Sequence, residues 1–176
     1  MFHGGGASGY IAALHSEPGD WATLMQRIRA DNYRGHRVRF SGFIKSEAAS
    51  AAHLWMRVDA IGGIRAFDGM QYRPIIGTTE WQKYVVVLDV PMDSDAIFFG
   101  LLFVGPRGKA WMDDLELEIV SNDVPTTERV HIVPDETLKA PSHATNLGFE
   151  MGYRARARAA HSGGEGILWP KSIADQ

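Results

Sequence analysis

The chain has 176 residues, with 18 Lys and Arg against 21 Asp and Glu, so its formal net charge is −3. It contains no cysteine, which excludes a disulfide framework, a zinc ribbon, a thiol nucleophile and an iron–sulfur cluster. The acidic balance argues against a protein that binds duplex nucleic acid mainly by neutralising phosphates. Hydrophobic residues make up 45% of the chain, and its length suits one domain with a sizeable core.

Short segments in which apolar and polar residues alternate recur through the first two thirds of the chain. Such alternation is typical of half-buried strands in an antiparallel sheet, and Gly, Pro, Asn and Asp mark turns between them. The segment 96–104 is apolar on both faces, which predicts a central strand. An Ala-rich stretch at 46–53 predicts the only helix. The predicted strands lie at 38–45, 54–59, 84–90, 96–104 and 114–119.

The sequence changes character after Val120. The following residues are polar, rich in proline and without a core face, which indicates an extended linker or wrapping segment. We therefore predict a β-sandwich at 1–122, an extended linker at 123–145 and a strand-bearing C-terminal segment at 146–176 that packs on the sandwich. No apolar run approaches the roughly 20 residues needed to span a bilayer. No signal peptide is visible either, so we expect a cytoplasmic protein without a membrane partner, unless the sequence is an excised domain.

Four stretches resemble strands of jelly-roll, galactose-binding-like domains related to carbohydrate-binding modules. They lie at 30–42, 54–59, 78–84 and 109–115. Their combination is similar to a bacterial domain often fused to helix-turn-helix transcription regulators. The resemblance implies an all-β fold, an antiparallel β-sandwich of jelly-roll topology. The DNA-binding helices are absent from this chain, so we expect no direct contact with nucleic acid.

One part of the family pattern is displaced. Related domains begin with a strand that carries Asn-x-x-Phe-Glu, whereas here Asn146–Glu150 has this pattern near the other end. The segment could supply the first strand of a circularly permuted domain, exchange with a partner chain in a homodimer, or open a truncated second copy. Because an open sheet edge is a pairing liability, we expect the segment to pair with the sandwich, within or between chains.

Trp55, Arg57 and Asp59 alternate with apolar residues and therefore project from one face of their predicted strand. An aromatic ring beside planar polar groups suits a sugar, and it equally suits another neutral ligand. The alternative is a Trp packed between the sheets, with Arg57 paired to Asp59 or Asp68. The predicted ligand-binding residues are Trp55, Arg57, Asp59, Asp68, Gln71, Arg73, Met25 and Gln26.

Further aromatic residues divide into two predicted groups. Phe99, with Leu101 and Phe103, is expected to make the ligand cleft apolar, which would favour a hydrophobic ligand over a polysaccharide. The remaining assigned tryptophans are predicted to plug the space between the sheets rather than to bind ligand. These are Trp21, Trp81 and Trp111.

Asp113 has the same parity as Leu115 and Leu117, which predicts an inward-pointing carboxylate that needs a partner. The resemblance implies calcium, because related modules bind a structural calcium ion through this Asp, the Glu of Asn-x-x-Phe-Glu and backbone carbonyls. The metal ligands would then be Asp113 and Glu150. The alternative is a carboxylate that caps backbone amides without a metal. No other cofactor is expected.

The leading functional prediction is non-catalytic, sensor-like binding of a small molecule or carbohydrate on a concave sheet face. One alternative is an enzyme of the cyclase, isomerase or lyase kind, using the same cleft with Asp59 or Asp68 as acid or base. Another is a structural or interaction module. The histidines lack metal-ligand spacing, and neither a nucleophile elbow nor a phosphate-binding loop occurs, so no catalytic residue is assigned.

Overall fold

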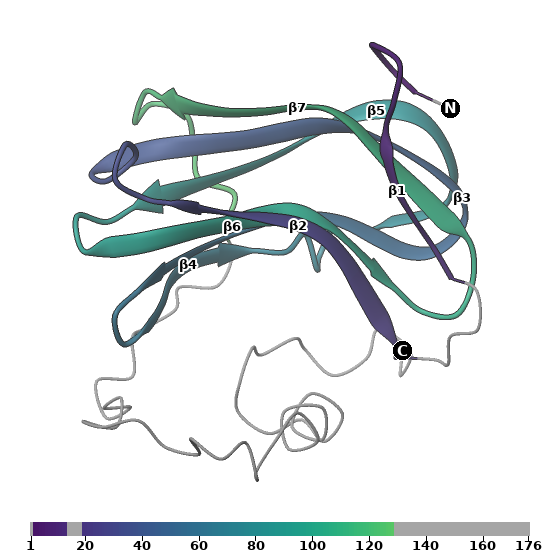
Figure 1. Ribbon diagram of the computed structural model, residues 1–176, viewed down its shortest axis with the longest axis horizontal. Coiled ribbons are helices and arrows are strands. Elements are labelled where there is room, and N and C mark those ends of the chain that lie inside the picture. The colour runs from purple at the N-terminus through teal and green to yellow at the C-terminus, as the bar shows by residue number, and fades with distance from the viewer. Residues whose placement is uncertain (1, 14–18, 129–176) are drawn as a thin grey trace, which may run out of the picture. The chain divides into compact units, whose positions relative to one another are not determined.

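The computed structural model describes residues 2–13 and 19–128. This part of the chain is all β, as predicted, and it includes no helix of the length and apolarity that a membrane span requires (Figure 1). The predicted C-terminal segment, 146–176, lies outside the described residues. The strands are β1 (Gly9–Ala12), β2 (Trp21–Arg29), β3 (His36–Ala60), β4 (Gly63–Asp68), β5 (Ile75–Val90), β6 (Ser94–Val104) and β7 (Lys109–Val120).

Strand β3 belongs to both layers of the fold. Its first half, His36 to Glu47, pairs antiparallel with β5 on one side and β7 on the other. Its second half, Ala51 to Ala60, pairs antiparallel with β6 and β4. Strand β1 extends the first layer beside β7, and β2 extends the second beside β6. We call the layer β5-β3-β7-β1 sheet I and the layer β4-β3-β6-β2 sheet II.

The helix predicted at 46–53 is wrong, because this stretch is the bend at which β3 passes from sheet I to sheet II. The register with β5 shifts between Ser46 and Ala49, and Ala48 has a φ of 47°. Ser46 Oγ donates to the carbonyl oxygen of Gly77 at 2.9 Å. Helix propensity is a weak local preference, and strand pairing on both sides overrides it here.

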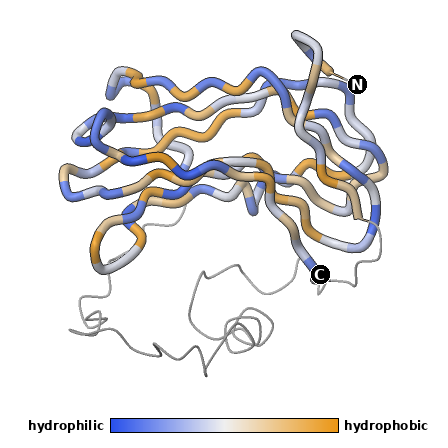
Figure 2. Tube along the Cα trace, viewed as in Figure 1, coloured by the Kyte–Doolittle hydropathy of each residue, from blue (hydrophilic) through white to orange (hydrophobic). Residues whose placement is uncertain are grey.

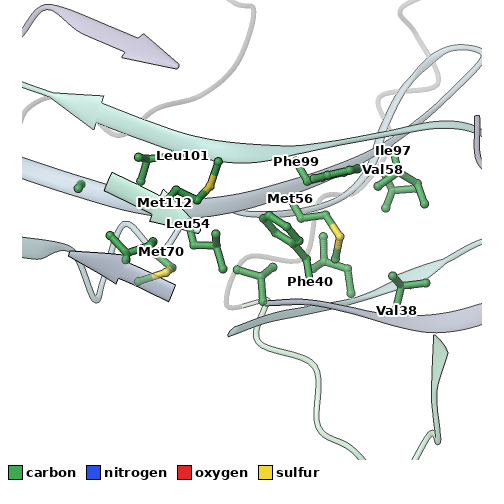
Figure 3. Close-up of a cluster of buried hydrophobic side chains, with 14 of the residues drawn as sticks. Val38, Phe40, Leu54, Met56, Val58, Met70, Ile97, Phe99, Leu101 and Met112 are labelled. Carbon is green, nitrogen blue, oxygen red and sulfur yellow. The ribbon is translucent and has the colours of Figure 1, made fainter. Parts of the chain in front are cut away.

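The hydrophobic core lies between the two sheets (Figure 3). The rings of Phe40 in sheet I and Phe99 in sheet II lie 4.9 Å apart between centroids. Alternate residues of the strands point inward, and in the outer strands hydrophobic and hydrophilic positions often follow one another along the trace (Figure 2). The prediction that Phe99, Leu101 and Phe103 line a ligand cleft is wrong, because all three are buried in this core. As predicted, β6 is a central strand, between β3 and β2.

The outer face of sheet I is a charged surface. Arg37 pairs with Asp89 at 2.7 Å, and Arg39 pairs with Glu118 at 2.9 Å. Ion pairs exposed to water contribute little to stability, because solvent screens them and ordering long side chains costs entropy. This face is therefore a solvated surface whose charges are already matched.

Gly100 allows β2 to lie close against β6. It pairs with Met25 on one side and with Trp55 on the other. A Cβ atom at Gly100 would lie 2.2 Å from the carbonyl oxygen of Leu24 and 2.8 Å from the Cα of Met25. Both are backbone atoms, which cannot rotate away, so a larger residue would have to displace β2.

We expect Gly100→Ala to lower the free energy of unfolding by about 1–3 kcal/mol, because the added methyl group overpacks a backbone contact. Urea unfolding of the full chain measures this loss. Gly6→Ala is the matched control, since a Cβ at Gly6 would meet nothing within 4 Å. Equal stability of the two variants would contradict the prediction.

Candidate functional site

The outer face of sheet II carries the residues that the alternation in β3 predicts to share a face. Because their neighbours in β3 point into the core, Trp55, Arg57 and Asp59 project from the opposite side. The register places Met25 of β2 in the row of Trp55, and Phe98 of β6 in the row of Arg57. Four residues of the predicted set are thus brought to one face.

Trp55 is almost fully buried, with 7% of its surface exposed. Its Nε1–H donates to Thr23 Oγ1 at 3.0 Å, and Thr23 Oγ1 donates to the carbonyl oxygen of Leu101 at 3.0 Å. This chain of hydrogen bonds spans β6 at the level of Gly100, which has no side chain in the way. Trp55 therefore joins β3 to β2, and its ring is not an open platform.

Arg57 and Asp59 form an ion pair with 2.8 Å between Nη2 and Oδ2. The guanidinium carbon lies 4.7 Å from the ring centroid of Phe98, a cation–π contact. Among the described residues, Arg57 Nε and Asp59 Oδ1 are both buried without a hydrogen-bond partner. Buried polar atoms are nearly always paired in folded proteins. This ion pair thus keeps one donor and one acceptor that no described residue satisfies.

His53 lies on the same face, two residues before Trp55, and is 3% exposed. Its Nδ1 is likewise buried without a hydrogen-bond partner within the described ranges. Burial lowers the pKa of His53, and hydrogen bonding to the backbone of Met70 and Gly69 opposes this only in part. The ring is therefore neutral at neutral pH. Sequence reasoning missed His53, although it shares the parity of Trp55, because the predicted helix at 46–53 removed it from the strand.

Asp68 and Gln26 do not share the face of Trp55, and to that extent the predicted arrangement is wrong. Asp68 of β4 pairs with Met56, and Gln26 of β2 pairs with Phe99. Met56 and Phe99 both point into the core. Directly paired residues of an antiparallel sheet lie on the same side, so Asp68 and Gln26 are on the core-facing side of sheet II.

Asp68, Gln71 and Arg73 of the predicted ligand-binding set lie in or beside the turn after β4. Asp68 pairs with Arg73 at 2.6 Å and accepts a hydrogen bond from the backbone N–H of Met70 at 2.8 Å. Gln71 Oε1 accepts from the N–H of Gly69 at 3.3 Å. Side chains that bind the backbone two residues away order turns. Asp68, Gln71 and Arg73 thus hold this turn together.

The tryptophans that were predicted to plug the sandwich are placed differently. Trp21 is 49% exposed at the start of β2, so its prediction is wrong. Trp111 is partly exposed and stacks against Tyr10 of β1. Trp81 contacts the ring of His3 edge-on, at 5.8 Å between centroids. Aromatic identity does not separate these roles, which depend on whether a second layer covers the ring.

Asp113 lies on the outer face of sheet I and does not point inward as predicted. Asp114 has a φ of 47°, and the register between β3 and β7 shifts between Ser41 and Phe43. A β-bulge of this kind inserts a residue and reverses the alternation of faces. Asp113 consequently pairs with Phe43, away from the core.

Both carboxylate oxygens of Asp113 accept backbone hydrogen bonds. Oδ2 accepts from the N–H of His3 at 2.8 Å and from that of Gly4 at 3.2 Å, and Oδ1 accepts from the N–H of Asp114 at 2.8 Å. Desolvation alone would raise the pKa of Asp113, but these three N–H donors lower it. The His3 ring stacks on Phe43 with 3.7 Å between centroids. Asp113 therefore holds the N-terminal segment through these backbone N–H groups.

The residues at Asp113 do not suit calcium. Calcium takes six to eight oxygen ligands, whereas the Asp113 oxygens face N–H donors, whose positive ends disfavour a cation beside them. Within residues 2–13 and 19–128 no group of three or more His, Asp or Glu side chains could hold a metal ion. Glu150, the second predicted ligand, lies outside the described residues.

Comparison with known proteins finds no family model that matches the chain. The chain is 45% identical over 151 residues to an uncharacterized HTH-type transcriptional regulator, YbfP, of Bacillus subtilis strain 168. The match covers 84% of this chain and 49% of the regulator, so the chain spans about half the length of this curated relative.

Several solved structures are similar to parts of the chain. A family 16 carbohydrate-binding module has a TM-score of 0.46 at 13% identity, covering 66% of this chain and 79% of the module. TmCBM61, solved with β-1,4-galactotriose, has a TM-score of 0.46 at 14% identity, covering 67% and 74%. The enzymatically active domain of bacteriophage CBA120 tailspike protein 4 has a TM-score of 0.49 at 14% identity, covering 64% and 15%.

We expect the free energy of unfolding to fall as the pH drops below about 6.5, the ordinary pKa of histidine. The folded-state pKa of His53 lies below this value, so the unfolded chain binds a proton more readily than the folded chain. Lowering the pH therefore stabilises the unfolded state relative to the folded state. His53→Gln should flatten the dependence between pH 7 and 5, measured by urea unfolding. His36→Gln, at an exposed position, should leave the slope as it is. An unchanged slope in His53→Gln would contradict this account.

We expect Asp113→Asn to lower the melting temperature at neutral pH, because an amide accepts the three N–H groups less strongly than a carboxylate. The lowered pKa of Asp113 means that its contribution is present above the ordinary value of about 3.9 and disappears as the pH falls through the folded-state pKa. The difference between the variant and the parent chain should therefore vanish in acid. Adding EDTA should leave the melting temperature of both proteins unchanged. A lower melting temperature of the parent chain alone would instead indicate that Asp113 binds calcium.

Proposed function

We propose that this chain is a non-catalytic binding domain that takes a small, hydroxyl-rich, uncharged ligand, such as a carbohydrate, on the outer face of sheet II. The observation that carries the proposal is the pair Arg57 and Asp59. Arg57 Nε is a buried donor and Asp59 Oδ1 a buried acceptor, and neither has a hydrogen-bond partner in the part of the chain that the structure describes. Phe98 lies beside them, beneath the guanidinium.

A hydroxyl group fits such a pair, because it can accept from Arg57 Nε and donate to Asp59 Oδ1 at the same time. Leaving a buried polar atom without a partner costs about 1–3 kcal/mol. A ligand that supplies both missing bonds recovers that free energy on binding.

Within the Arg57–Asp59 ion pair, the charge favours an uncharged ligand over an anion. The guanidinium of Arg57 is already neutralised by Asp59 at 2.8 Å. A phosphate or carboxylate would have to displace Asp59 or lie beside its negative charge. A neutral polyol does neither.

The contacts of the two carboxylates favour binding over acid–base catalysis. Asp59 is held by Arg57, and Asp68 is held by Arg73 and by the N–H of Met70. The two carboxylates also lie on opposite sides of sheet II, so one substrate on the outer face would meet only Asp59. A role in a transcription regulator is supported by the 45% identity to YbfP, over the half of that protein that the chain spans. In that setting the domain would act as the ligand sensor.

We expect Arg57→Ala to weaken binding of a neutral sugar by at least about tenfold, which corresponds to losing roughly 1.4 kcal/mol from one hydrogen-bonded anchor. The full chain would be titrated calorimetrically with β-1,4-galactotriose and xylohexaose, and with glucose 6-phosphate as the anionic comparator. Asp59→Asn should weaken binding by a smaller factor, since the amide can still accept.

Arg39→Ala is the matched control, because Arg39 is also an arginine of β3 paired to a carboxylate, but on the outer face of sheet I. Its affinity should equal that of the parent chain. Equal losses in the two arginine variants, or tighter binding of the phosphate than of the neutral sugars, would contradict the proposal.

A further inference from the structure

The two side edges of the sandwich differ in how well they are covered. At the edge formed by β5 and β4, Val86, Leu88 and Ala66 are at most 4% exposed. The segment after β7 runs along this edge. The N–H of Thr127 donates to the carbonyl oxygen of Val87 at 2.9 Å, and the N–H of Val87 donates to Thr127 Oγ1 at 2.8 Å. This edge is closed.

The opposite side edge is formed by β2 of sheet II and β7 of sheet I, and β2 is the more exposed of the two strands. Seven of the nine residues of β2 are exposed. They include Trp21 at 49%, Leu24 at 40% and Met25 at 44%. Within the described residues β2 is the last strand of sheet II, so its side away from β6 has no strand partner. A free strand edge with exposed apolar side chains is a place where another strand pairs.

The free side of β2 carries a regular series of backbone groups. The register with β6 runs along the whole strand without a shift. Just beyond its two ends, the N–H of Gly105 donates to the carbonyl oxygen of Asp20 at 2.8 Å, and the N–H of Ala30 donates to that of Asp95 at 3.0 Å. Because hydrogen-bonded positions alternate in an antiparallel pair, the even-numbered residues of β2 bond to β6. The odd-numbered residues therefore turn their N–H and C=O groups toward the free side. They are Trp21, Thr23, Met25, Arg27 and Arg29.

We propose that this free edge pairs with the same edge of a second copy of the chain, antiparallel and with the two-fold axis at Met25. Met25 then lies opposite the partner's Met25, and Trp21 lies opposite the partner's Arg29. Each odd-numbered residue from 21 to 29 meets an odd-numbered residue, so the free N–H and C=O groups of both strands are paired. Sheet II continues from one copy into the other in a closed, two-fold arrangement. The pairing requires no ligand.

The side chains of β2 are compatible with this register. The ring of Trp21 meets the guanidinium of the partner's Arg29, which suits a cation–π contact. Arg29 pairs with Asp31 in its own chain, and its side chain is still 85% exposed. Arg27 lies opposite the partner's Thr23. The directly opposed residues of the two β2 strands thus never carry like charges, which would destabilise the pair.

Strand β7 offers a less suitable edge for a second copy. Strand β1 already pairs with its first part, Lys109 to Met112, and a bulge at Asp114 interrupts the regular alternation that follows. Beyond the bulge, Glu116 and Glu118 lie on the outer face of sheet I. Antiparallel pairing with a second β7 over this stretch would place carboxylates opposite each other. Bulges and charges of this kind protect natural strand edges from pairing.

Disulfide trapping tests the register, because the chain has no cysteine of its own. Directly opposed Cα atoms of a hydrogen-bonded antiparallel pair lie about 5.5 Å apart, which is within disulfide range. Met25→Cys in the full chain, oxidised at low micromolar concentration, should therefore give a disulfide-linked dimer. Leu24→Cys is the matched control, since Leu24 is similarly exposed but lies opposite the partner's Gln26. Two copies of it would be about 8 Å apart on the diagonal, too far for a disulfide.

Sedimentation equilibrium of the full chain, from low micromolar to submillimolar concentration, gives a readout without cysteines. We expect a reversible dimer with a dissociation constant in the micromolar range, because one pair of edge strands makes a small interface. Met25→Lys brings two positive charges together on the axis and should weaken dimerisation by at least about tenfold. Ile119→Lys, at a position of β7 that is 48% exposed, should leave it unchanged. Circular dichroism verifies that both variants are folded.

The proposal is overturned if the parent chain is monomeric throughout this range, or if Met25→Lys dimerises as the parent chain does. It is also overturned if Leu24→Cys forms as much disulfide as Met25→Cys. Loss of the dimer in both lysine variants would overturn it too, because the basic edge of β2 would then pair with the acidic edge of β7 in the second copy.

Discussion

The structure depends on the continuity of β3, whose 25 residues run from His36 to Ala60 through both sheets. One strand therefore sets the faces of two layers. Its first half aligns β5 and β7, and its second half aligns β6 and β4. The bend at 46–53, with its register shifts and the φ of 47° at Ala48, turns the chain while alternate residues continue to point into the core.

The candidate site follows from this alternation in the second half of β3. Trp55 is tied to β2 by its bond to Thr23, while Arg57 and Asp59 pair with each other and leave one atom each without a partner. Trp55 thus packs β3 against β2, whereas Arg57 and Asp59 form an ion pair on the same face. The hydrogen bond from Trp55 to Thr23 also holds the edge strand β2 in place. The close approach that Gly100 allows between β2 and β6 contributes to the same end.

Different interactions hold the N-terminal segment and cover the side edges of the sandwich. Asp113 uses its carboxylate to hold the N-terminal segment, and the bulge at Asp114 turns it toward that segment. Beyond the bulge, Ile119 remains exposed beside an unpaired strand edge, while Thr127 closes the opposite edge. Within the described residues, the sandwich thus has one closed and one open side edge.

The sequence by itself determined parts of β3, β5, β6 and β7 and the face of Trp55, because alternation is a local property of an extended backbone. It did not predict β1, β2 or β4. It also identified the jelly-roll resemblance. Tertiary structure decided the bend at 46–53, the outward turn of Asp113 and the core-facing position of Asp68. Each of these depends on a partner strand: a bulge at Asp114 reverses parity, and register assigns a residue to a face. Burial of the Trp55 ring likewise depends on Thr23, which lies 32 positions away along the chain and meets it only across β6.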